Sequence, residues 1–174
     1  DPFLGKGSVT VSQVFFTSPS QCAVPDQASI QLDRRLTWGE TRESAVAEVQ
    51  DAALRAGYPD AKVIVLRYEE PAYTGLVYPT DKYYPTWVLE ENSPFLKNAV
   101  ESFEGVLDRK PVVDKWHFST NGVAIAGMHK IPCIGLGPGN EVFAHAVDEA
   151  TPVAHLREAA AFYAAFIAHL NGKC

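Results

Sequence analysis

The sequence lacks the features by which a protein binds nucleic acid or enters a membrane. Its 15 lysines and arginines form no cluster, and 21 acidic residues bring the formal net charge to −6. Binding to nucleic acid or to an anionic membrane requires concentrated positive charge. No apolar run approaches the ~20 residues of a membrane-spanning helix. We therefore expect neither nucleic acid nor a membrane as a partner.

Cysteine is also scarce. The three cysteines, Cys22, Cys133 and Cys174, are odd in number, lie far apart and include no CxxC pair. Disulfide frameworks are typical of small secreted domains with paired cysteines. The sequence therefore predicts a reducing compartment, the cytoplasm. It also predicts a fold held together by a hydrophobic core, because 47% of the residues are hydrophobic.

Several catalytic motifs are missing. There is no GxSxG nucleophile elbow, which disfavours a serine hydrolase. The glycine-rich stretch GLGPG at 135–139 lacks the lysine and the following serine or threonine of a phosphate-binding loop. Neither HExxH nor HxH occurs, so no local sequence motif defines a complete metal site.

The first seventy residues have the pattern β-β-α-β. Periodicity predicts strands over 7–16, 27–36 and 61–69 and a helix over 41–59. Thr41 is the expected N-cap of that helix, with Ser44 at the capping-box position. Residues 71–92 are rich in proline and aromatic residues and have little periodicity, so they predict an ordered crossing between two domains.

Residues 93–174 have the pattern α-β-α-β-α. The expected elements are a helix over 93–108 with Ser93 as cap, strands over 110–119 and 131–137, a turn with a short helix or loop over 120–130, and a long helix over 151–172. The apolar stripe of the last helix is expected to consist of Leu156, Tyr163, Ile167 and Leu170.

One loop carries the strongest candidate for a metal ligand. In GPGNEVFAHAVDE, His145 follows a glycine turn and precedes Asp148 and Glu149. Open α/β sheets place ligands at the ends of buried strands, and a nearby acid often orients a metal-binding imidazole. The competing interpretation is a solvated loop histidine. For His117, His129, His155 and His169 a structural or solvated role is expected.

Two polar stretches are candidates for substrate contacts. In DRRL, one of Arg34 and Arg35 can reach a substrate anion, although the pattern by itself favours a surface salt bridge. In FSTNG, Ser119, Thr120 and Asn121 offer hydroxyl and amide groups at a strand end. Such groups bind substrate carbonyls, and they also cap turns.

Taken together, CAVPDQASIQLDRRL, FSTNGVAIAGMHKIPCIGLGPG and AHAVDE resemble the metallopeptidase family of acetylornithine deacetylase, succinyl-diaminopimelate desuccinylase and aminoacylase. YTGLVYPTDKYYPTW and PVVDKWHFSTNG are most similar to the branch of selenium-metabolism-linked hydrolases. The resemblance implies an α/β (α+β) fold. It consists of a partial ferredoxin-like lid and dimerisation domain over 1–70, a crossing over 71–92, and the C-terminal part of a zinc-peptidase-type catalytic domain over 93–174.

The resemblance also implies roles for particular residues. His145 corresponds to the last metal ligand of the family, with Asp148 and Glu149 supporting its loop. Arg35, Ser119, Thr120, Asn121 and Gly137 correspond to positions that line the substrate site. The other ligands of a two-zinc centre and the general base precede the lid in the family. We therefore expect this chain to be the C-terminal part of a longer hydrolase and, by itself, to be inactive and without zinc.

Two departures from the family pattern concern the substrate. Cys22 stands where many members have asparagine, and Val123 stands where many have an arginine that pairs with the substrate's α-carboxylate. Valine makes no such pair, so an ordinary N-acyl amino acid bound in the usual way is not expected.

Three hypotheses follow. The first is part of a two-metal hydrolase that acts on a small amide or a related C–N bond and dimerises through its lid. The second is an interaction module whose free sheet edge pairs with another chain. The third is a product of a split gene or of proteolysis that needs the missing N-terminal catalytic segment to complete its core.

Overall fold

The computed structural model describes residues 1–172 and belongs to the α+β class, with helices and small antiparallel sheets. The chain divides into two compact units, residues 1–86 and a second unit that begins at Trp87. The division falls within the stretch 71–92. Among the helices of the described residues, none is both long enough and apolar enough to cross a membrane.

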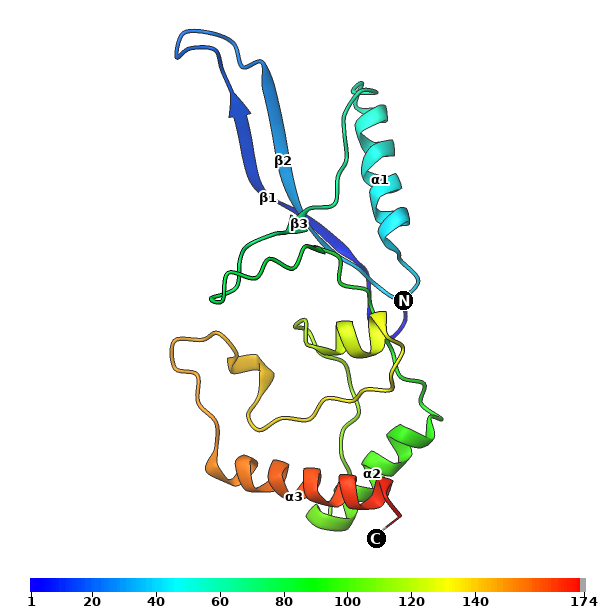
Figure 1. The fold of residues 1–174 in the computed structure, drawn as a ribbon. Coiled ribbons are helices and arrows are strands. Elements are labelled where there is room, and N and C mark those ends of the chain that lie inside the picture. Colours follow the sequence, from blue (N-terminus) through cyan, green and yellow to red (C-terminus); the bar gives the residue numbers. More distant parts are fainter. Residues whose placement is uncertain (173–174) are drawn as a thin grey trace. The chain divides into compact units, whose positions relative to one another are not determined.

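A long antiparallel hairpin dominates the first unit. It pairs β1 (Ser8–Thr17) with β2 (Gln27–Arg35), which confirms the first two predicted strands (Figure 1). The register shifts between Val11 and Gln13, where β1 contains a bulge. Opposed residues of an antiparallel pair share a face, and β2 alternates regularly. The bulge therefore keeps the apolar residues on either side of it on one face, which we call the apolar hairpin face: Val9, Val11, Val14, Phe16, Ala28, Ile30 and Leu32.

The apolar hairpin face is largely exposed. Val14 is 67% exposed, Phe16 68% and Ile30 57%. A two-stranded hairpin has marginal stability in water unless further strands or a helix cover its apolar side. The first unit, as described, thus presents an apolar surface that its own elements do not cover.

Helix α1 (Arg42–Arg55) begins as predicted. The Thr41 backbone N–H donates to the Ser44 hydroxyl (2.8 Å), and the Ser44 N–H donates to the Thr41 hydroxyl (3.2 Å), which completes a capping box. Gly57, with φ +88°, follows the C-terminus of α1 in the left-handed conformation that favours glycine. Arg34 of β2 pairs with Glu40 and with Glu48 of α1 (2.7 Å), so a charged contact links the hairpin to the helix.

The predicted strand over 61–69 is wrong for most of its length. Only β3 (Arg67–Tyr68) forms, and it pairs with the equally short β4 (Thr80–Asp81). Residues 62–65 have strand-like composition, but they exchange no backbone hydrogen bond with any part of the described chain. Composition alone does not make a strand, because its backbone groups need a neighbouring strand.

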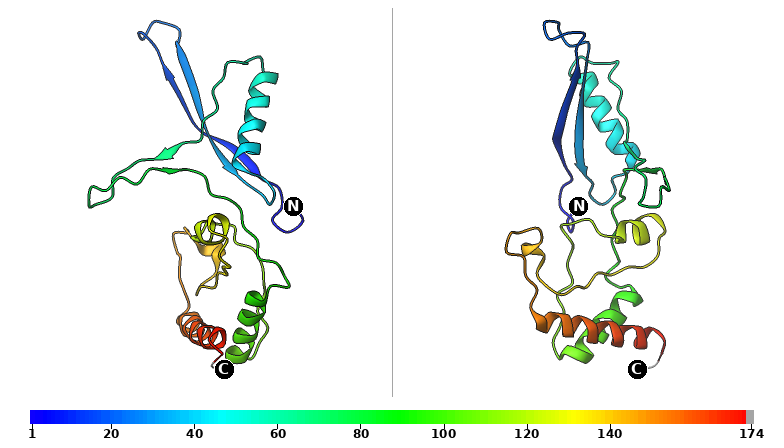
Figure 2. Two further views of the ribbon diagram at one scale, coloured as in Figure 1. Left: turned by 45° about the vertical axis from the view of Figure 1, so that its right-hand side comes forward. Right: turned by 60° about the vertical axis from the view of Figure 1, so that its left-hand side comes forward.

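The second unit is built on helices α2 (Pro94–Leu107) and α3 (Val153–Leu170), which lie side by side (Figures 1 and 2). Ser93 occupies the N-cap position of α2 and Pro94 its first turn, as predicted, although the Ser93 side chain makes no capping bond. Phe162, 2% exposed, stacks on Phe166 with ring centroids 5.5 Å apart. These rings and Ala99 form the core of this unit.

The predicted apolar stripe of α3 is wrong as its buried face. Leu156, Tyr163, Ile167 and Leu170 are each 45–61% exposed, whereas the buried residues of α3 are Ala159, Phe162 and Phe166. Helix α3 is rich in apolar residues around most of its circumference, so its sequence does not identify a single buried face. The faces were decided by the partner helix, whose Phe95 and Phe103 meet the Phe162 and Phe166 rings.

The predicted strands over 110–119 and 131–137 are also wrong, because neither stretch forms a ladder with another part of the described chain. The second is nevertheless fixed in place. Ile134 and Leu136 pack against the core, and the Tyr163 hydroxyl of α3 donates a hydrogen bond to the Leu136 carbonyl. Between the two stretches lies the π-helix η1 (Val123–Met128), which confirms the predicted turn and short helix.

We expect Phe162→Ala to lower the free energy of unfolding by about 3–5 kcal/mol, because it removes a buried ring. Ile167→Ala, further along the same helix and 61% exposed, serves as the control and should change the free energy of unfolding by about 0.5 kcal/mol or less. Equilibrium urea denaturation of both variants measures the difference. Equal effects would mean that the buried face of α3 has been assigned wrongly.

Candidate functional site

The loop between residues 137 and 149 carries the predicted metal ligand. It begins with a turn in which Gly139 has φ +104°, and it contains the short 3-10 helix η2 (Glu141–Phe143). The Asn140 side chain caps η2 by accepting a hydrogen bond from the Val142 N–H (3.0 Å). The order turn, cap and short helix brings the chain to His145 in a defined conformation.

His145 adopts a left-handed backbone conformation, with φ +66°. For a residue with a β-carbon this conformation costs about 1–2 kcal/mol, and such strain clusters at functional sites. The imidazole is exposed, and neither ring nitrogen bonds to a residue of the described chain. Its ring lies against Phe118, with centroids 5.2 Å apart and planes tilted by 32°. The Phe118 ring thus orients the imidazole, and within the described chain the ring nitrogens remain free for a ligand.

Of the two carboxylates predicted to support this loop, Glu149 makes a visible contact. Its carboxylate accepts a hydrogen bond from the His145 backbone N–H (3.1 Å). This bond holds the backbone of His145 and leaves the imidazole nitrogens available. Asp148 is exposed on the same loop.

Glu141 connects the His145 loop to the polar turn at 118–122. Its carboxylate accepts hydrogen bonds from the backbone N–H groups of His117 (2.6 Å) and Phe118 (3.3 Å), and the His117 Nδ1 lies 3.4 Å away. These bonds lower the pKa of Glu141, chiefly through the His117 backbone N–H. The anchored segment bears the Phe118 ring that contacts His145, so one carboxylate aligns both halves of the candidate site.

The turn that follows Phe118 holds the predicted hydroxyl and amide groups. Ser119, Thr120 and Asn121 are exposed. The Thr120 hydroxyl accepts from the Gly122 N–H (3.2 Å), and the Asn121 carbonyl accepts from Ala124 and Ile125 at the start of η1. The structure therefore brings this turn into the neighbourhood of His145 through Phe118. Thr120 also caps this turn through its hydroxyl, the alternative role expected for such residues.

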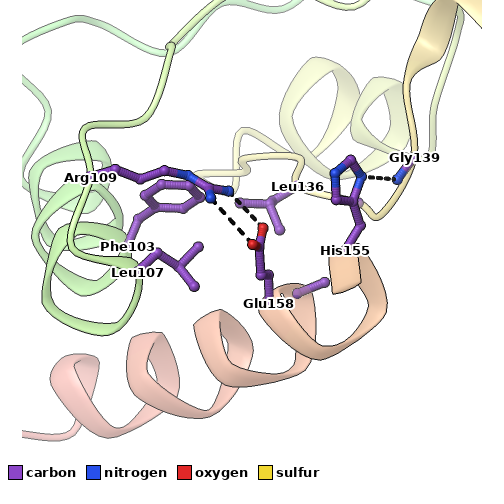
Figure 3. A pocket seen from close by; sticks show the side chains of 9 residues that line it. Phe103, Leu107, Arg109, Leu136, Gly139, His155 and Glu158 are labelled. Atoms are coloured by element: carbon purple, nitrogen blue, oxygen red, sulfur yellow. Dashed lines mark hydrogen bonds and ion pairs between the residues drawn. The ribbon is translucent and has the colours of Figure 1, made fainter. Parts of the chain in front are cut away.

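Two other predicted substrate residues have surroundings of their own. Arg35 lies in the first unit, where it is exposed and pairs with Asp33 (3.0 Å). Gly137 lies at the start of the loop and lines a cavity of about 210 Å³ against α2 and α3 (Figure 3). In that cavity Arg109 makes a bidentate ion pair with Glu158, at 2.6 and 3.2 Å.

The remaining histidines have different surroundings. His117 bonds to Glu141, and Nδ1 of His169 lies 3.1 Å from the buried Ser102 hydroxyl. Nδ1 of His155 accepts a hydrogen bond from the Gly139 N–H. His129 is exposed. None of these four lies with other histidines, cysteines or carboxylates in a group that fits a metal ion within residues 1–172.

The described residues can supply one ligand of a metal site, His145. An oriented, exposed imidazole is an ordinary ligand for zinc, and the Glu149 contact leaves both ring nitrogens for coordination. No group of three or more candidate ligands occurs in the described residues. A metal held by His145 would therefore need its other ligands from beyond these residues.

Sequence reasoning missed Glu141 and Phe118. Glu141 sits in the same quoted loop as His145, four residues earlier, and a carboxylate directly after the Asn140 cap was the available signal. No pattern linked it to residues 117–118, because the two positions are 23–24 residues apart and meet only in three dimensions.

We expect Glu141→Gln to loosen the anchor at neutral pH, because the amide lacks the charge that strengthens both bonds. Since the folded pKa of Glu141 is lowered, its contribution to stability is present above the ordinary value of 4.5 and is lost as the pH falls through the folded pKa. Hydrogen exchange at the His117 and Phe118 amides should therefore be faster in the variant at pH 7, and the difference should shrink in acid. Glu91→Gln, at an exposed position, is the control. A variant indistinguishable from the wild type at pH 7 would contradict the anchor.

Comparison with known proteins gives relatives at high identity. No family model matches the sequence. The chain is 53% identical over 165 residues to the protein of Escherichia coli strain K12 named Uncharacterized protein YgeY, and equally to the protein of that name from Escherichia coli O157:H7. The alignment covers 95% of this chain, and the chain spans 41% of the length of these curated relatives. More than half of each relative thus lies outside the region that this chain matches.

Proposed function

We propose that this chain is the C-terminal part of a metal-dependent hydrolase that cleaves an amide or a related C–N bond. His145 supplies one ligand of a centre of two metal ions, expected to be zinc. The remaining ligands and the general base come from a preceding segment of a longer protein. The isolated chain is therefore inactive.

One observation carries this proposal. The residue that the family resemblance assigns as ligand, His145, has a left-handed backbone, an oriented ring and two uncommitted ring nitrogens within the described chain. A solvated loop histidine also has free ring nitrogens, and Asp108 and Lys130 also have positive φ, so the ring contact with Phe118 is the feature that favours the ligand role. The Glu141 anchor explains the orientation of the ring, because Glu141 binds the Phe118 backbone and the Phe118 ring contacts the imidazole.

The polar turn at 119–121 supports a substrate site beside the ligand. Its exposed hydroxyl and amide groups are suited to hydrogen bonds with a substrate carbonyl or amide. Val123 follows after Gly122, at the start of η1. Its apolar side chain favours a substrate without a carboxylate at that position. A bound metal would polarise the carbonyl and activate water, while this chain's residues hold one ligand and orient the substrate.

We expect His145→Ala in the full-length protein to lower the bound zinc, measured by elemental analysis. It should also reduce kcat/KM by at least about 100-fold, since even the partners of metal ligands cost 10- to 100-fold when lost. The assay uses a panel of small N-acylated amines and amides. His129→Ala, at an exposed histidine outside the site, should leave both quantities unchanged. Full metal content and full activity in His145→Ala would refute the proposal.

A second function has its own observation. The apolar hairpin face exposes large residues, and the hairpin has no further strand beside it in the described chain. Such a surface marks an interaction site. We therefore propose that the first unit also serves as a dimerisation surface, in the manner that the lid resemblance implies.

We expect Val14→Asp combined with Ile30→Asp to convert a dimer into a monomer, because buried charges without partners destabilise an interface. Multi-angle light scattering measures the mass in solution. The control is Ser29→Asp, which places one negative charge on the opposite face of β2 and should leave the dimer intact. A wild-type protein that is monomeric at every concentration tested would contradict this function.

A further inference from the structure

The first turn of α3 holds the glycine turn of the His145 loop. The Gly139 N–H donates a hydrogen bond to Nδ1 of His155, at 3.3 Å (Figure 3). Gly139 has a left-handed backbone, and a β-carbon built on it would lie 3.2 Å from the Thr151 hydroxyl. The turn is therefore packed closely against the start of α3, and His155 provides the side-chain contact.

This contact exists in only one protonation state of the ring. A backbone N–H always donates, so Nδ1 of His155 must be the unprotonated nitrogen of a neutral imidazole. In the imidazolium both nitrogens carry protons, and the contact becomes a repulsion between two donors. Histidine changes its charge between pH 5 and 8, so the contact is sensitive to pH in the physiological range.

The charged groups that face His155 act in opposite directions. The positive end of the α3 dipole disfavours a cation in the first turn. Glu158, one turn further along, attracts a cation and interacts electrostatically with His155. Arg109, which follows α2, holds the Glu158 carboxylate in a bidentate pair and lines the same cavity. The neutral ring thus binds Gly139, and the protonated ring has Glu158 as its alternative partner.

We propose that His155 is a positioning residue that fastens the glycine turn of the His145 loop when it is neutral and releases the turn when it is protonated. The turn begins the loop that presents His145, so release loosens the presentation of that side chain. The effect on metal binding rests on the proposed function. The contact between His155 and Gly139 does not.

The test measures hydrogen exchange at the Gly139 amide by NMR in the protein uniformly labelled with ¹⁵N, prepared without added metal. Protection relative to the intrinsic rate should fall about two- to tenfold between about pH 8 and about pH 5. His155→Ala should show the low protection at both pH values. His155→Asn should keep the high protection at both, because its amide oxygen occupies the place of Nδ1 and accepts at any pH.

Two controls separate this effect from unfolding. His129→Asn makes the same exchange of side chains at an exposed position and should behave as the wild type. The Phe162 amide, in the buried part of α3, should keep its protection in every variant. Equal Gly139 protection at both pH values in the wild type, or equal protection in His155→Ala and the wild type at pH 8, would overturn the proposal.

The result is independent of the proposed hydrolase. If Gly139 protection follows the pattern above while His145→Ala retains metal and activity, the fastening stands and the hydrolase assignment fails. If protection is insensitive to His155 while His145→Ala loses metal, the hydrolase assignment stands and the fastening fails.

Discussion

A β-strand is stable only when the backbone groups along its edges meet those of a neighbour, and this requirement shapes both units of the chain. The hairpin β1–β2 satisfies it along one edge of each strand. Residues 62–65, 110–119 and 131–137 have the composition of strands but no such neighbour in the described chain. Their positions depend instead on side chains and on helices, as the bond from Tyr163 to the Leu136 carbonyl illustrates.

Because the described residues of the second unit form no sheet, their order comes from α2 and α3 and from single polar anchors. The Phe162 and Phe166 rings fix the helix pair. From that pair, His155 reaches Gly139, and from the loop itself Glu141 reaches the backbone at 117–118. The two anchors act at different points of one loop. Together they account for how an exposed, strained residue such as His145 keeps a defined orientation.

Each of these two anchors also depends on one protonation state of its side chain. Glu141 acts as a carboxylate, and His155 accepts a hydrogen bond through an unprotonated Nδ1. A histidine that binds a metal likewise does so through an unprotonated ring nitrogen.

Local sequence determined the features that depend on near neighbours. These are the hairpin strands, the capping box of Thr41 and Ser44, the start of α2 at Pro94 and the choice of His145 as a candidate ligand. What only the tertiary structure decided depends on residues that are distant along the chain. The buried face of α3 was set by the rings of α2, and the apolar stretches stayed unpaired because no strand of residues 1–172 lay beside them. Glu141, Phe118 and His155 gained their roles from partners 16–27 residues away in the sequence, a separation at which periodicity and capping patterns carry no information.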